Sequence, residues 1–218
     1  MKKTLKIIFF LFAPAVLVAC AKTSTSPVTE DMQGHSRYIP DDYAFELQYP
    51  EDWVVADKNN MYEPRIRELI DAQQNEAEGL PDFSTNLVAV FFNLDNREFL
   101  RGEMRLSVYL TKDEFADREV LKQEIIDRVE ERFIAEFYLA DWLKYPMDID
   151  YGGSEGLMFT LTHSENDRPR TIYHMLTKKG DYFILLAYKN TDGLHRMATT
   201  KLLETIYETI ILPEERIN

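Results

Sequence analysis

Alternating hydrophobic and polar positions predict β-strands in both halves of the chain. In the first, Tyr43, Phe45, Leu47 and Tyr49 alternate with Ala, Glu and Gln, and Pro50 ends the run. A second short run returns beside it, a hairpin follows, and the last three runs form an antiparallel meander. The expected strands cover 43–49, 53–56, 86–94, 104–110, 156–163, 171–177 and 182–188.

Hydrophobic residues at helical spacing predict three helices. A short helix begins at Pro64 and ends before Gly79. A longer one spans 111–134, with a capping box in its first four residues and a single apolar face. Thr191 or Asp192 is expected to cap the last helix, which should cover one face of the sheet.

The first twenty residues have the layout of a lipoprotein signal peptide. Three lysines precede an apolar run of 13 residues, Ile7 to Ala19, which is shorter than the roughly 18 residues of a membrane span. The run ends Leu17-Val18-Ala19-Cys20, which resembles the lipobox of bacterial lipoproteins. This box is favoured over an ordinary secreted leader or a buried helix. It predicts a Cys20 that carries diacylglycerol and acyl chains such as palmitate.

The remaining organisation follows from composition along the chain. Residues 21–40 are rich in Ser, Thr and Pro without periodicity, as in a flexible tether. Ala21 stands where, by resemblance to enterobacterial lipoproteins, Asp would favour the inner membrane, so we expect the outer membrane, facing the periplasm. The expected division is a signal peptide (1–19), lipidated Cys20 with its tether (20–40), one domain (41–213) and a C-terminal tail (214–218).

Charge and cysteine content exclude several function classes. The net charge is -13, and cleavage after Ala19 would remove three lysines and leave an acidic mature protein of -16. Such a surface repels phosphates, so nucleic acid is not an expected partner. Cys20 is the only cysteine in the sequence, which rules out an internal disulfide and a cysteine zinc cluster.

No residues in the sequence have the spacing of a catalytic, metal or cofactor site, so we expect neither an enzyme nor a cofactor. Asp148 and Asp150 would share one face of a strand, but no regular set of calcium ligands accompanies them. Ser154 fits neither a nucleophile motif nor a phosphate loop, and a plain turn is favoured there. The four histidines are scattered: His35, His163, His174 and His195.

Aromatic residues are dense just before Pro146. Phe137, Tyr138, Trp142 and Tyr145 occupy nine positions, and two of them share a face if the preceding helix continues. Such a cluster is either core or a recognition surface, and core is favoured. The candidate residues for docking a protein partner are Tyr138, Trp142 and Tyr145.

Both ends of the predicted domain resemble a known family. The segment 43–53 is an alternating strand that ends in aromatic-Pro-x-x-Trp, and 153–188 has the strand and turn order of PsbP-like domains, followed by the final helix. The resemblance implies an α+β fold in which an antiparallel sheet is sandwiched between α-helices. It also implies a role in binding or assembly, since many bacterial members are lipoproteins and known members are not enzymes. No functional residue of the family can be matched to a position here.

Two interpretations of function remain. We prefer a membrane-anchored envelope lipoprotein that acts as a noncatalytic protein-binding or assembly module with an envelope protein partner. The alternative is a small-ligand carrier or hydrolase whose site residues converge only in the fold. A sheet face filled by side chains would favour the first. A deep pocket with His163 or His174 near carboxylates would favour the second.

Lipidation can be tested directly at Cys20. We expect Cys20→Ser to abolish labelling by radioactive palmitate and to remove the processed protein from detergent-extracted membranes, because serine has no thiol to acylate. A Cys20→Ser protein that remains processed, labelled and membrane-bound would contradict the prediction.

Overall fold

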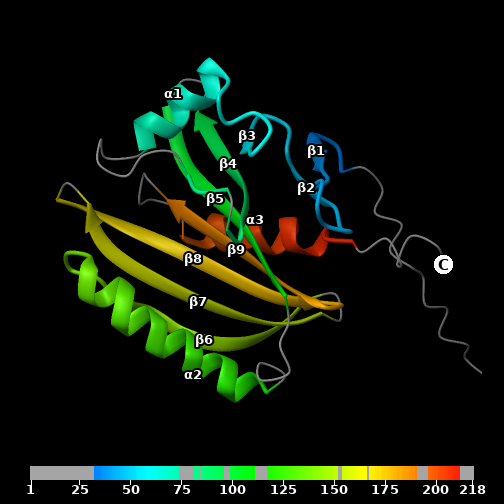
Figure 1. Ribbon diagram of the computed structural model, residues 1–218. Helices are drawn as coiled ribbons and strands as arrows, with labels where there is room; N and C mark the ends of the chain where they lie inside the picture. The colour runs from blue at the N-terminus through cyan, green and yellow to red at the C-terminus, as the bar shows by residue number, and fades with distance from the viewer. Residues whose placement is uncertain are drawn as a thin grey trace, which may run out of the picture.

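The computed structural model describes most of the chain from Met32 to Ile211 (Figure 1). The described ranges are 32–73, 81–83, 85–95, 99–110, 117–151, 154–165, 167–190 and 196–211. The signal peptide, Cys20, Thr191, Asp192, His195 and the C-terminal tail lie outside them.

A seven-stranded antiparallel sheet organises the domain, in the order β3-β4-β5-β9-β8-β7-β6. It contains the predicted hairpin, β4–β5, and the predicted meander, β7–β8–β9, whose strands extend beyond the predicted limits. Pairing of β5 with β9 joins these two parts. The strands are β3 (Val54–Asp57), β4 (Leu87–Asp95), β5 (Phe99–Leu110), β6 (Asp141–Tyr151), β7 (Ser154–Glu165), β8 (Arg168–Lys179) and β9 (Tyr182–Asn190).

Helices cover both faces of this sheet, which confirms the predicted α+β class (Figure 1). The helices are α1 (Pro64–Gln73), α2 (Arg118–Arg128), its π-helical continuation η2 (Val129–Ile134) and α3 (Arg196–Glu208). Among the described helices, none combines the length and apolarity needed to cross a bilayer.

Most of the apolar core lies between the sheet and α3. Leu106, Leu186 and Met175 from three neighbouring strands are buried there against Ile206 of α3. Trp53 closes the cluster and stacks on the ring of Tyr188, with centroids 5.9 Å apart. This face of the sheet is filled by side chains.

The opposite face is covered unevenly. Residues paired across the strands share a face, and one such row runs from Val90 through Arg105, Ala187 and His174 to Phe159. Val90 packs beneath α1 in a second apolar cluster. At the other end, α2 packs beside β6. The central part of the row therefore lies between two helices.

The first predicted strand differs from its expected form. Residues His35–Tyr38 form a strand, β1, which pairs with β2 (Leu47–Pro50). The folded part thus includes residues assigned to the tether. The segment at 54–57 pairs with β4, so it is not a return strand beside β2.

Alternation in β2 also fails as a guide to burial, because both of its faces are covered. Glu46 and Gln48 are buried, although the pattern placed them in solvent. The backbone of Glu46 exchanges two 3.0 Å hydrogen bonds with Ile211. The backbone N–H of Gln48 donates to Thr209 Oγ1 at 2.8 Å. Residues more than 160 positions away along the chain therefore bond backbone groups of Glu46 and Gln48.

The sequence places a strand only at Asp148 and Asp150, whereas β6 begins at Asp141, and the preceding helix does not continue to Trp142. Pro146 lies within β6, between two register shifts at Trp142/Lys144 and Lys144/Met147. An edge strand tolerates proline because one side of its backbone makes no ladder hydrogen bonds. Trp142 consequently lies on a strand and shares no helical face with Tyr138.

The long helix is confirmed, with a different start among the described residues. The predicted capping box at 111–114 lies outside them, and α2 begins after Asp117. The Asp117 carboxylate accepts hydrogen bonds from the Glu119 and Val120 amides at 2.8 and 3.4 Å, as an N-cap residue does.

Candidate functional site

A groove of about 980 Å³ lies between α2 and the sheet. No residue of α2 or η2 is fully buried, although Leu121, Ile125, Val129 and Phe133 line the side toward the sheet. Leu121 and Ile125 reach partway into the cluster of Leu157, Leu176 and Phe183. The helix is therefore held beside the sheet with a hollow along its length.

Both walls of the groove are mainly apolar. Residues one helical turn apart, Leu121, Ile125, Val129 and Phe133, form the helix wall. The sheet supplies residues from β7, β8 and β9: Phe159, His174, Leu176, Phe183 and Leu185. Volumes of about 300–1,000 Å³ with mostly apolar linings are typical of small-molecule sites.

Charged side chains lie along the helix beside the apolar row. Glu124, Arg128 and Arg132 line the groove at intervals of four residues, and Arg128 Nε donates to Glu124 Oε1 at 2.8 Å. Burial raises the pKa of Tyr109 on β5, while the nearby Arg128 guanidinium opposes the rise. Arg128 thus lies close enough to influence the opposite wall.

His174 supplies a neutral aromatic surface to the groove. Its ring stacks on Phe159, with centroids 4.3 Å apart and an interplanar angle of 5°. Desolvation lowers the pKa of His174 to about 3. The imidazole is therefore uncharged at neutral pH, and it offers flat apolar area rather than a positive charge.

The other sequence candidates do not join this site. His163 is buried at the end of β7, where Phe133 and Phe137 contact its ring edge-on, with centroids 5.5 and 5.4 Å away. Burial and the Lys189 charge lower its pKa, although Glu165 opposes them. The structure brings His163 and His174 into no shared ligand set. Within the described ranges, no three His, Cys, Asp or Glu side chains are grouped to hold a metal ion.

Asp148 belongs to an ion-pair cluster on the surface. Lys122 Nζ lies 2.7 Å from Asp148 Oδ2, and Arg118 lies 3.4 Å from Oδ1. These cations, Lys122 above all, lower the pKa of the Asp148 carboxyl. The aspartate therefore fixes α2 to β6. Ser154 is the first residue of β7 and Asp150 lies on β6.

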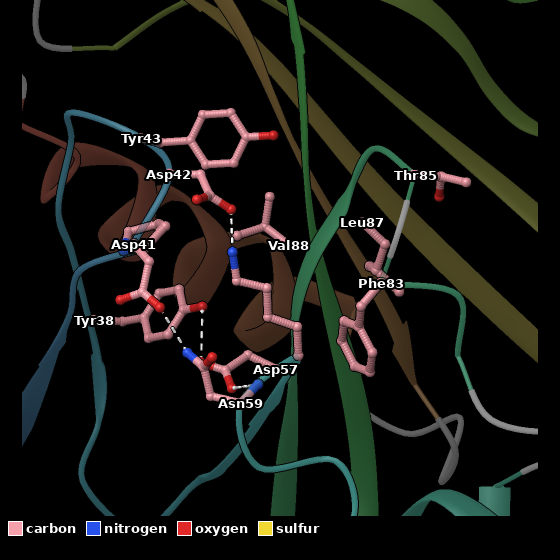
Figure 2. A pocket seen from close by; sticks show the side chains of 12 residues that line it. Tyr38, Asp41, Asp42, Tyr43, Asp57, Asn59, Phe83, Thr85, Leu87 and Val88 are labelled. Atoms are coloured by element: carbon pink, nitrogen blue, oxygen red, sulfur yellow. Dashed lines mark hydrogen bonds and ion pairs between the residues drawn. The ribbon is translucent and has the colours of Figure 1, made fainter.

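A second, smaller hollow of about 190 Å³ lies beside β3, and Figure 2 shows its polar side chains turned toward one another. Asn59 Nδ2 donates to Asp41 at 2.7 Å, and Lys58 pairs with Asp42. Tyr38 donates to Asp57 at 3.4 Å, and burial followed by the Asp57 charge raises the pKa of Tyr38. These polar groups bind one another, and their contacts hold β1 and the residues after it against β3.

Three of the predicted aromatic residues are exposed, which contradicts their assignment to the core. Tyr138 is 69% exposed, Tyr145 57% and Phe137 42%. Trp142 is partly buried and stacks on Tyr145 with centroids 4.8 Å apart. The structure thus brings Trp142 and Tyr145 together at the sheet edge, with Tyr138 in the turn that precedes β6.

Sequence reasoning missed the groove. The one available signal was the combination of an apolar row and a parallel row of charges on the same predicted helix. Periodicity assigns that apolar row to a packed core, because it cannot report how far the helix stands from the sheet.

Comparisons with known proteins define the fold class. No protein-family model and no curated protein matches the sequence. Among solved structures, cyanobacterial PsbP (CyanoP) from Synechocystis aligns with a TM-score of 0.53 and 13% identity, over 83% of this chain and 94% of that one. The chain therefore has a PsbP-like fold, which confirms the expectation from the sequence resemblance.

Two further solved structures align with lower TM-scores. A crystal structure from Bacteroides thetaiotaomicron aligns with a TM-score of 0.50 and 15% identity, over 83% of this chain and 49% of that one. This chain thus spans about half of that protein. LpqN of Mycobacterium tuberculosis, described as involved in cell envelope biogenesis, aligns with a TM-score of 0.48 and 11% identity, over 82% and 84%. At that similarity we infer nothing from it.

The lowered pKa of His174 predicts a pH dependence of stability. Between its ordinary pKa near 6.5 and about 3, the unfolded chain binds a proton at His174 that the folded chain does not, so stability falls as pH falls. We expect wild type to lose up to about 2 kcal/mol more than His174→Phe between pH 6.5 and 4.5. Urea unfolding of both proteins measures this, and titration of shared carboxylates cancels in the difference. Parallel stability curves would contradict the prediction.

Proposed function

We propose that this protein is a noncatalytic binding protein of the bacterial envelope, and that the groove between α2 and the sheet is its binding site. The groove itself carries the proposal. It combines a volume of about 980 Å³ with apolar residues on both walls, so an apolar group placed there leaves water. Each buried CH₂ would contribute about 0.8 kcal/mol.

The chemistry of the lining supports binding rather than catalysis. His174, on the sheet wall of the groove, has a pKa of about 3 and stacks on the ring of Phe159. A general base works best when its pKa lies near the working pH, so this imidazole suits contact with a ligand better than proton transfer. The two carboxylates at the rim, Glu124 and Asp42, are held by Arg128 and Lys58.

The envelope location rests on the sequence. The proposed lipid on Cys20 would hold the protein at the outer membrane, facing the periplasm. The described part of the chain begins at Met32, and the segment from Cys20 to Met32 would reach roughly 40 Å if fully extended. That reach would let the groove open away from the bilayer.

A protein partner is the second candidate function, and the exposed aromatic residues beside β6 favour it. Tyr138 and Tyr145 are largely exposed, and exposed Leu139 lies next to the first of them. Tyrosine and tryptophan contribute strongly to protein interfaces because their large rings lose little conformational entropy on binding. This surface would dock an envelope protein.

The groove proposal can be tested with the fluorescent apolar probe N-phenyl-1-naphthylamine. We expect Ile125→Asp to abolish most of its binding, because a charge in the apolar wall must lose water when the groove fills. Val120→Asp is the matched control, since Val120 lies on the same helix, is 49% exposed and does not line the groove. Thermal unfolding followed by circular dichroism confirms that both variants fold. Equal probe binding by the two variants would refute the groove as the site.

Cross-linking in intact cells tests the partner surface. We expect a stoichiometric cross-linked envelope protein that is lost in the double variant Tyr138→Ser, Tyr145→Ser. The control is Tyr62→Ser, because that tyrosine is 68% exposed and lies before α1, away from β6. A cross-link that survives in the double variant, or none in wild type under efficient cross-linking, would remove the second candidate.

A further inference from the structure

We infer that the groove accepts a single-chain amphiphile with an anionic headgroup, a long-chain fatty acid being the simplest example, and that Arg132 receives the headgroup. This inference rests on the proposed function, because it names the ligand of the same groove. It follows from the shape of the groove and from the charges that line it.

The groove has enough volume for an acyl chain. The groove holds about 980 Å³ between one helix and one sheet face. A single acyl chain fits between the walls with volume to spare. The chain would contact Phe183 and Leu185 on the sheet and Ile125 on the helix.

The charges select the headgroup. Four charged residues line the groove: Asp42, Glu124, Arg128 and Arg132. Glu124 forms an ion pair with Arg128, and Asp42 forms one with Lys58, which does not itself line the groove. Arg132 is the fourth, and no residue in the described part of the chain forms an ion pair with it. Among the described residues, Arg132 is therefore the one charge lining the groove that has no ion-pair partner, in a protein of net charge -13.

The position of Arg132 suits a headgroup. It follows Arg128 by four residues on the charged row, and its neighbour Phe133 lies on the apolar wall. A carboxylate at the rim would bind the guanidinium through two parallel hydrogen bonds while its chain extends along the wall. The π-helical turn at Val129–Ile134 contributes these residues, and such turns frequently occur at functional sites.

The test compares three ligands with the same sixteen-carbon chain. Palmitate, hexadecanol and hexadecyltrimethylammonium, each below its micelle concentration, displace N-phenyl-1-naphthylamine from the whole mature chain, residues 20–218, produced without the signal peptide so that Cys20 carries no acyl chain. We expect palmitate to bind most tightly. Arg132→Gln should weaken palmitate about fivefold and leave hexadecanol unchanged, as expected for one exposed charge interaction. The matched control, Arg65→Gln on exposed α1, should change neither.

The outcomes separate this inference from the proposal beneath it. Equal affinity for palmitate and hexadecanol, unchanged by Arg132→Gln, would overturn the anionic headgroup and leave the apolar groove as a binding site. No displacement by any of the three ligands, together with no probe binding, would overturn both. Sedimentation adds one more outcome: a dimer that Ile125→Asp dissociates would assign the groove to a second copy, and would also overturn the inference.

Discussion

Pairing between β5 and β9 is the contact on which the rest of the domain depends. Nine consecutive residue pairs, from Gly102↔Asn190 to Leu110↔Tyr182, join the N-terminal hairpin to the C-terminal meander. The close approach of Tyr188 to this ladder requires Gly102, because a Cβ there would lie only 2.0 Å from the Tyr188 hydroxyl. The ladder places apolar residues from both halves on one face and sets which residues line the other.

The two faces differ because the helices differ in how they are joined to the sheet. α3 follows β9 and is held by the strand at 46–48 through Thr209 and Ile211, so its apolar side is closed against the core. α2 lies between central β5 and edge β6 in the chain. Ion pairs at Asp148 and aromatic contacts at His163 hold the two ends of the helix and its continuation, and Leu121 and Ile125 pack only partway into the sheet cluster. Between these ends the groove remains unfilled.

Much of the fold follows from the sequence because local patterning and burial agree in most of the sheet. The apolar run at 182–188 predicts β9 correctly, since one face of the strand meets the core and the other contributes Phe183 and Leu185 to the groove. Pattern-based reasoning fails at Glu46 and Gln48, whose backbone groups form hydrogen bonds with residues near the other end of the chain. It fails at β6 because Pro146 and two register shifts interrupt the period. The groove exists because α2 stands away from the sheet, and hydrophobic periodicity does not report the distance between two elements.

The irregular edge strand has a consequence for the protein at high local density. An unpaired strand edge is a template for pairing with another molecule, and anchoring to a membrane confines molecules to two dimensions. In β6, Pro146 removes one backbone donor and the two register shifts break the regular spacing of the others. A crowded layer of these domains would thus resist edge-to-edge growth into continuous sheets, and each molecule would retain its own exposed tyrosines for other contacts.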